Sequence, residues 1–225
     1  MFPMSQKDGN HTRLLTSAAK RVLRPLGLIQ KGYSRTWLAD QGWWLAVIEF
    51  QPSGWSRGSY LNVGCMWLWN VHEHLSFDVG YRVDDFQPFE TEQQFGLVAQ
   101  QLAEHARDKV AEYRERFRTV GQVSDYYLQN PVDSFWPCFN AAIAHMMSGR
   151  MTPASVLMSR CVTAEENDPP WLSKARHVAR TMGGMVGEQL RFRKFISDRV
   201  QESRHLHKLP PHENLDFGSE RIVSE

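Results

Sequence analysis

The sequence predicts an α+β protein. An N-terminal helix and a long helix pack on an antiparallel four-stranded sheet, and an α-helical C-terminal part follows. Three observations predict this order. Apolar residues recur at helical spacing over residues 12–24, segments between residues 31 and 83 are rich in β-branched and aromatic side chains, and the chain from Gly121 onward has helical periodicity.

The first helix is expected to end at Pro25 and Gly27, because Pro cannot continue a helix and Gly suits its C-terminal cap. Alternating or continuously apolar segments then predict strands at residues 31–37, 43–51, 59–69 and 75–83. Their short links favour an antiparallel meander. Residues 84–89 are expected to form a loop.

Thr91 is expected to cap the long helix, which extends to about residue 119 with one apolar and one charged face. Five further helices are predicted at residues 123–129, 134–148, 153–165, 170–182 and 188–205. These patterns divide the chain into a sheet domain (11–120), a helical subdomain (121–208) and a flexible polar tail (209–225).

The composition is that of an ordinary globular protein, with 42% hydrophobic and 23% charged residues and a net charge of +1. No global field draws the chain to nucleic acid or to an acidic membrane. The sequence has no secretory signal and no apolar run of the roughly 20 residues that span a bilayer. A cytoplasmic location without membrane contact is therefore predicted, with reduced thiols.

Tryptophan is the unusual component, with 8 residues in the chain. Six of them precede residue 70: Trp37, Trp43, Trp44, Trp55, Trp67 and Trp69. Aromatic cross-strand pairs inside an aromatic-rich sheet explain most of them. The alternative is a binding surface, where Trp and Tyr supply much of the energy.

One stretch resembles a known family. The segment Leu23–Gly27 with Lys31-Gly32 fits an "LxPLGF-x-(K/R)-(K/R)-G" pattern, although Leu28 replaces its Phe. The segment from Phe50 to Trp55 fits "VxxFQxSxW", with Pro52 where a basic residue is common, and Tyr60, Asn62 and Gly64 fit "(F/Y)x(I/V)NxG". The chain is similar here to the bacterial domain-of-unknown-function family 4304. The resemblance implies an α+β sheet domain followed by helices, and no activity.

The densest polar and aromatic group spans the end of one expected strand, a loop and the start of the next: Gln51, Ser53, Trp55, Arg57, Tyr60 and Asn62. Buried amides on a sheet usually satisfy structural partners. Loops on a rigid sheet also carry binding sites. The leading hypothesis assigns these residues to a non-catalytic protein that binds another protein, as an immunity or accessory component of a bacterial toxin or phage-defence system.

The alternative is a nucleic-acid-binding accessory subunit. Basic side chains outnumber acidic ones over residues 171–208. Arg191, Arg193 and Lys194 interleave with Phe192 and Phe195, a pattern that suits nucleic acid or an acidic partner. An ordinary solvated helix face explains it too.

No catalytic residue or cofactor is predicted, because nucleophile-elbow and phosphate-loop motifs are missing and no CxxC occurs. His72 and His74 are the weak metal candidates, with His11 or Asp78 as a third ligand, but an exposed polar turn explains the pair better, and no metal is predicted. A third interpretation is an enzyme whose pocket combines Gln51, Arg57, Tyr60 and Asn62 with the His72/His74 turn.

Overall fold

The computed structural model describes residues 10–163 and 168–218. The expected end of one helix at residue 165 and the last part of the tail, 219–225, lie outside these residues. Within them the chain is α+β with an antiparallel sheet, as the sequence predicts. It divides into two compact units. The first comprises residues 10–66 and 74–115, and the second comprises residues 67–73 together with those from 116 onward.

The sheet of the first unit has five strands, so the predicted number of four is wrong. They are β1 (Ile29–Gln30), β2 (Thr36–Asp40), β3 (Trp44–Gln51), β4 (Gly58–Trp67) and β5 (Val79–Pro88), in that order across the sheet. The additional strand β1 pairs Ile29 with Leu38 and Gln30 with Trp37. Two residues are too few to produce an alternating pattern, which is why the sequence does not reveal this strand.

The edge strand β5 lies further along the chain than expected. Residues 75–78 are not part of it, and residues 84–88, which were expected to be a loop, pair with the start of β4. The register shifts twice, between Ser59 and Leu61 and between Leu61 and Asn62. Such bulges insert unpaired residues and break the period of two from which strands are predicted.

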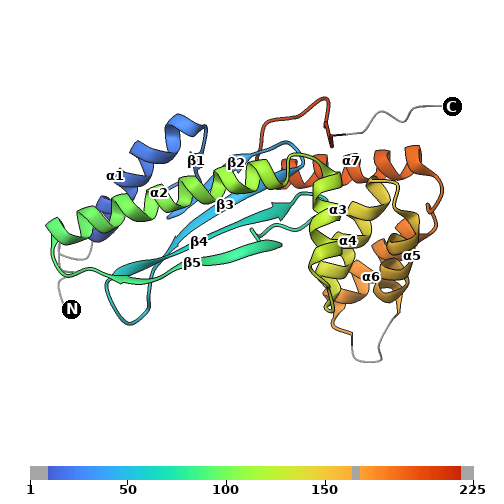
Figure 1. Cartoon of the computed structure of the whole chain (residues 1–225), viewed down its shortest axis with the longest axis horizontal. Helices are drawn as coiled ribbons and strands as arrows, with labels where there is room; N and C mark the ends of the chain where they lie inside the picture. Colours follow the sequence, from blue (N-terminus) through green and yellow to red (C-terminus); the bar gives the residue numbers. More distant parts are fainter. Residues whose placement is uncertain (1–9, 164–167, 219–225) are drawn as a thin grey trace. The chain divides into compact units, whose positions relative to one another are not determined.

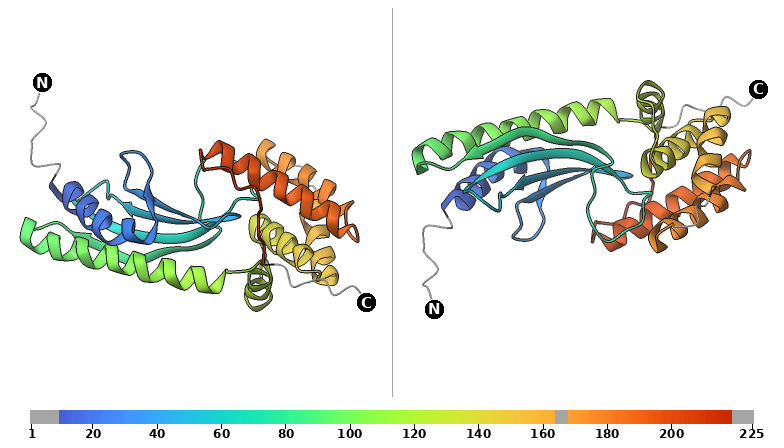
Figure 2. Two further views of the ribbon diagram at one scale, coloured as in Figure 1. Left: turned by 90° about the horizontal axis from the view of Figure 1, so that it is seen from above. Right: turned by 90° about the horizontal axis from the view of Figure 1, so that it is seen from below.

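Helices α1 (Asn10–Leu23) and α2 (Glu92–Arg116) lie beside each other on one face of this sheet (Figures 1 and 2). Arg21 on α1 donates to Gln100 on α2, and Tyr113 on α2 donates to the carbonyl of Val63 on β4. Gly80 adopts φ +79°, and a Cβ there would lie 2.2 Å from the Tyr113 hydroxyl, so the close approach of α2 requires glycine.

The predicted helix ends are confirmed at two positions. The 3₁₀ turn η2 (Arg24–Leu26) follows α1 and ends at Gly27 with φ +78°. The Thr91 hydroxyl accepts from the backbone N–H of Gln94, 3.1 Å away, and caps α2. None of the helices formed by the described residues combines the length and apolar character that a membrane crossing requires.

The second unit is helical: α3 (Val120–Gln129), α4 (Phe135–Met147), α5 (Met151–Val162), α6 (Pro170–Gly183) and α7 (Gln189–Leu206). Thr119 and Gln122 form a capping box at the start of α3. Residues 209–218, which were expected to be flexible, contact this unit. Phe217 is buried, and its carbonyl accepts from the N–H of Val120 at 2.9 Å.

Two tryptophans, the last residue of β4 and another two residues after it, belong to the core of the second unit. Trp67 stacks on Trp69 and donates from its indole N–H to the Tyr127 hydroxyl at 3.0 Å. Trp69 donates to Asn140 Oδ1 at 2.9 Å. Of the six tryptophans before residue 70, five are at most 2% exposed and so do not form an exposed binding surface: Trp37, Trp43, Trp44, Trp67 and Trp69.

Candidate functional site

A network of polar side chains joins the three strands β3, β4 and β5. Its centre is Asn62 on β4, which is completely buried. The amide nitrogen of Asn62 donates to Glu49 Oε2 at 2.8 Å and to Gln51 Oε1 at 3.0 Å, both on β3. Its amide oxygen accepts from Arg82 Nε at 2.9 Å, on β5. Three of the four hydrogen-bonding directions of the buried amide therefore serve other side chains.

This network holds the guanidinium of Arg82 in one place. Arg82 Nη2 donates to Gln51 Oε1 at 2.8 Å. The Cζ atom of Arg82 lies 3.9 Å from the ring centroid of Tyr60, a cation–π contact, and 5.4 Å from that of Tyr81. Arg82 remains exposed although its position is fixed.

The loop that joins β3 to β4 carries the other predicted residues. The Ser53 hydroxyl accepts from the backbone N–H groups of Trp55 and Ser56, at 3.1 and 3.4 Å, and so shapes the loop. The carbonyl of Arg57 accepts from the N–H of Phe89 at 2.9 Å. Trp55 is 98% exposed. Among the six tryptophans before residue 70, Trp55 alone is exposed enough to belong to a binding surface.

The structure brings Gln51, Tyr60 and Asn62 together, whereas Ser53 and Arg57 have local contacts in the loop. Sequence reasoning missed Glu49 and Arg82. Each lies on a strand whose register with β4 cannot be read from the sequence, and Arg82 stands directly opposite Asn62. The sequence signal that could have found them is a charged residue on each of the two strands next to the strand that carries Asn62.

Internal contacts engage the basic side chains that were considered for nucleic acid. Arg191 forms an ion pair with Glu188, and Lys194 forms one with Asp198. Arg193 donates to the carbonyl of Met147 at 3.0 Å. Other basic residues of α6 and α7 are also anchored to the protein: Arg176, Arg199 and Arg204. These contacts reduce the charge that the helices offer to a phosphate backbone, and the nucleic-acid interpretation stays a prediction.

The histidine candidates do not assemble into a metal centre in the part of the chain that the structure describes, where no three His, Cys, Asp or Glu side chains gather as ligands. The ring of His72 lies 6.4 Å from that of His207. His11, one suggested third ligand, has its Nε2 2.8 Å from Arg35 Nη2.

Burial disfavours the reactive form of two cysteines, Cys138 and Cys161. Cys65 is buried as well. Burial raises the pKa of Cys161 to about 12, with a further contribution from the neighbouring Cys138. Burial also raises the pKa of Cys138. Because the thiolate is the reactive form, neither thiol is activated near neutral pH.

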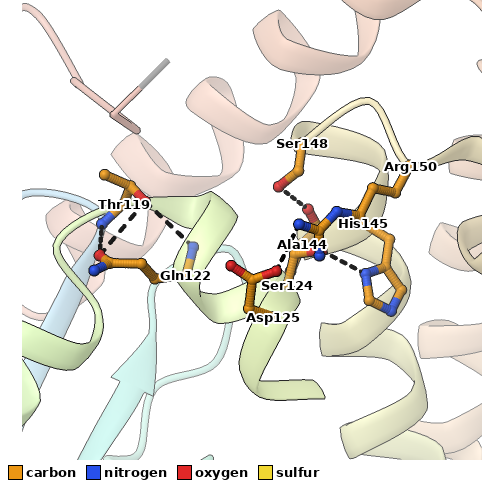
Figure 3. Close-up of polar contacts among 8 residues, drawn as sticks. All are labelled: Thr119, Gln122, Ser124, Asp125, Ala144, His145, Ser148 and Arg150. Carbon is orange, nitrogen blue, oxygen red and sulfur yellow. Dashed lines mark hydrogen bonds and ion pairs between the residues drawn. The ribbon is translucent and has the colours of Figure 1, made fainter. Parts of the chain in front are cut away.

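A buried polar cluster in the second unit was also missed (Figure 3). Ser124 Oγ on α3 lies 2.6 Å from His145 Nδ1 on α4, and Arg150 donates to the same Oγ at 3.0 Å. Arg150 also pairs with Asp125. Because the Ser124 oxygen has two lone pairs, it can accept from Arg150 and still either donate to a neutral Nδ1 or accept from an Nδ1–H of His145. Ser124 is 0% and His145 1% exposed, so the pair joins helices and is shielded from solvent.

We expect this cluster to make the protein sensitive to acid. Burial lowers the pKa of His145 below its ordinary 6.5, Arg150 lowers it further, and Asp125 opposes them. As the pH falls, His145 therefore takes up a proton in the unfolded chain before it does so in the folded protein. The contribution of neutral His145 to the free energy of unfolding is fully present above about pH 6.5, and it is lost as the pH falls through the lower pKa of the folded state.

The measurement is the free energy of unfolding of wild type and His145→Asn between pH 7.5 and 5. The Asn oxygen can still accept from Ser124 but cannot be protonated. The stability advantage of the wild type over the variant should shrink as the pH falls. A difference that is constant across this range would contradict the expectation.

Comparison with known proteins identifies no relative: no family model matches the chain, and neither a curated protein nor a solved structure is significantly similar. The resemblance to family 4304 therefore stays a prediction.

Proposed function

We propose that this chain is a non-catalytic protein that binds another protein through its polar sheet surface. The side chains of this surface are the predicted Gln51, Ser53, Trp55, Arg57 and Tyr60, together with Glu49 and Arg82. The sixth predicted residue, Asn62, is buried and holds Arg82 in position. The role we propose for such a partner-binding protein, by analogy alone, is that of an immunity or accessory component of a bacterial toxin or phage-defence system.

The exposure of Trp55 carries the proposal. An indole that is 98% exposed leaves a large apolar ring in water, where it contributes nothing to the fold. Ser53 holds the loop in shape through two hydrogen bonds, and regular strands fix both of its ends. A large aromatic side chain on a preordered loop is typical of binding hot spots, since little entropy is lost when a partner covers it.

The experiment captures tagged protein from a lysate of its native host, treated with nuclease, and compares wild type with Trp55→Ala. We expect a stoichiometric protein partner that the variant loses, with truncation of a central aromatic anchor weakening binding by roughly 30-fold or more. The matched control is Trp171→Ala, which removes another exposed tryptophan, 53% accessible, from helix α6.

Three outcomes would count against the proposal. They are equal capture by wild type and Trp55→Ala, equal losses with Trp55→Ala and Trp171→Ala, and recovery of nucleic acid in place of protein when nuclease is omitted. The last result would favour the basic helices of the second unit instead.

A further inference from the structure

We infer that the polar sheet surface recognises a carboxylate group of its protein partner, and that Arg82 binds this carboxylate through two parallel hydrogen bonds. The inference rests on the proposed function and specifies its chemistry.

Among the residues that the structure describes, none forms a hydrogen bond to one edge of the Arg82 guanidinium. The edge formed by Nε and Nη2 is occupied, because Nε donates to Asn62 Oδ1 and Nη2 donates to Gln51 Oε1. Covalent geometry leaves a second edge, with one N–H on Nη1 and one on Nη2 pointing away from the side-chain stem. Two parallel N–H groups match the two oxygens of a carboxylate.

The charge of Arg82 is still available to a ligand. Within the described part of the chain, Arg82 donates to two neutral amide oxygens, and neither of them neutralises its charge. Glu49 is the nearby carboxylate of the network, but it accepts from Asn62 and not from Arg82. An arginine that is oriented in advance, and not paired with an acid, loses less entropy on binding than an ordinary surface arginine does.

Tyr60 determines the direction of approach. The Cζ atom of Arg82 lies over the Tyr60 ring, 3.9 Å from its centroid. A ring this close covers one side of the cation, so a ligand is bound at the remaining edge.

A carboxylate fits better than a phosphate. The network contains one cation, Arg82, and one carboxylate, Glu49, so it does not favour a dianion. Phosphate sites usually gather several donors or cations around the anion. A single planar fork near an acidic neighbour matches a monoanion, such as the side chain of Asp or Glu on the partner.

The first test requires no partner. The side-chain N–H signals of Arg82 are followed by NMR in the full chain during titration with sodium acetate. Sodium phosphate and sodium chloride at matched ionic strength form the other arms. We expect saturable shifts with acetate at an apparent Kd on the order of 10 mM, a strength suited to one charged fork.

The control within the same molecule is Arg21, which is exposed and donates to the amide oxygen of Gln100 without an aromatic ring against it. Its signals should move much less than those of Arg82. Equal, non-saturating shifts at the two arginines would overturn the inference. Tighter binding of phosphate than of acetate at Arg82 would overturn the carboxylate assignment.

The second test uses the captured partner. Arg82→Gln should weaken its binding roughly 10- to 100-fold, and Arg82→Lys should restore little of this loss, because Lys keeps the charge but lacks the fork. Arg21→Gln should leave the affinity unchanged. If Trp55→Ala abolishes binding while Arg82→Gln has no effect, the proposed function stands and this inference is wrong. If no partner is captured, the proposed function fails, and the acetate titration separately decides whether Arg82 binds a carboxylate.

Discussion

Replacing Trp67 by alanine is expected to lower the free energy of unfolding by about 3–5 kcal/mol, the usual cost of truncating a buried aromatic side chain. Trp67 is 0% exposed, stacks on Trp69 with ring centroids 5.4 Å apart, and contacts the edge of Phe117 at 5.2 Å. Removal of the indole leaves a cavity among these rings and takes a hydrogen-bond donor from Tyr127.

Urea denaturation followed by circular dichroism measures this loss. Trp67→Phe keeps most of the ring and removes only the donor, so about 1 kcal/mol should be attributable to the hydrogen bond, plus a small packing loss. Trp55→Ala is the matched control, since its exposed ring should contribute less than about 0.5 kcal/mol. The assignment of Trp67 to the core would be refuted if its alanine variant unfolded at the same urea concentration as Trp55→Ala.

Replacing Arg176 by methionine should also cost about 3–5 kcal/mol, because it leaves a buried carboxylate without its cation. The side chains of Arg176 and Asp168 are each 8% exposed. Arg176 donates to Asp168 Oδ2 and Oδ1, and its Nη1 donates to the carbonyl of Cys161 at 3.1 Å. Helix α6 is thereby tied both to the residues before it and to the end of α5.

Two variants separate this pair from ordinary surface charge. Lys194→Met breaks an exposed pair with Asp198 and should change stability by less than about 0.5 kcal/mol. The double variant Asp168→Leu/Arg176→Met should recover much of the loss, since an apolar pair leaves no buried charge, although the Cys161 carbonyl still lacks its donor. If Arg176→Met and Lys194→Met had equal free energies of unfolding, the buried ion pair would contribute no more than an exposed one.

Local signals in the sequence are sufficient to predict the helices. Pro25 and Gly27 end α1, and Thr91 caps α2, as expected. These signals act within a few residues of where they stand. The course of β5 could not be predicted in this way. Its pairing is shifted by two bulges, and the absence of space for a Cβ at Gly80 is due to Tyr113, in a helix that follows later in the chain.

The candidate site was predicted in part for the same reason. Gln51, Tyr60 and Asn62 lie close together in the sequence, so their polar and aromatic character is visible as a cluster. Arg82 joins them only because β5 places it opposite Asn62. The pairing of Ser124 with His145 likewise depends on how α3 packs against α4, which no pattern in either helix reveals.

The assignment of residues 67–73 to the second unit has a consequence for synthesis on the ribosome. The carbonyl of Asn70 accepts from Ser203, a residue 133 positions later in the chain. At common translation rates the ribosome needs on the order of 10 s to add that length. During this interval the indoles of Trp67 and Trp69 have no completed helical core in which to be buried, so the nascent chain presents an aromatic segment to which a chaperone could bind.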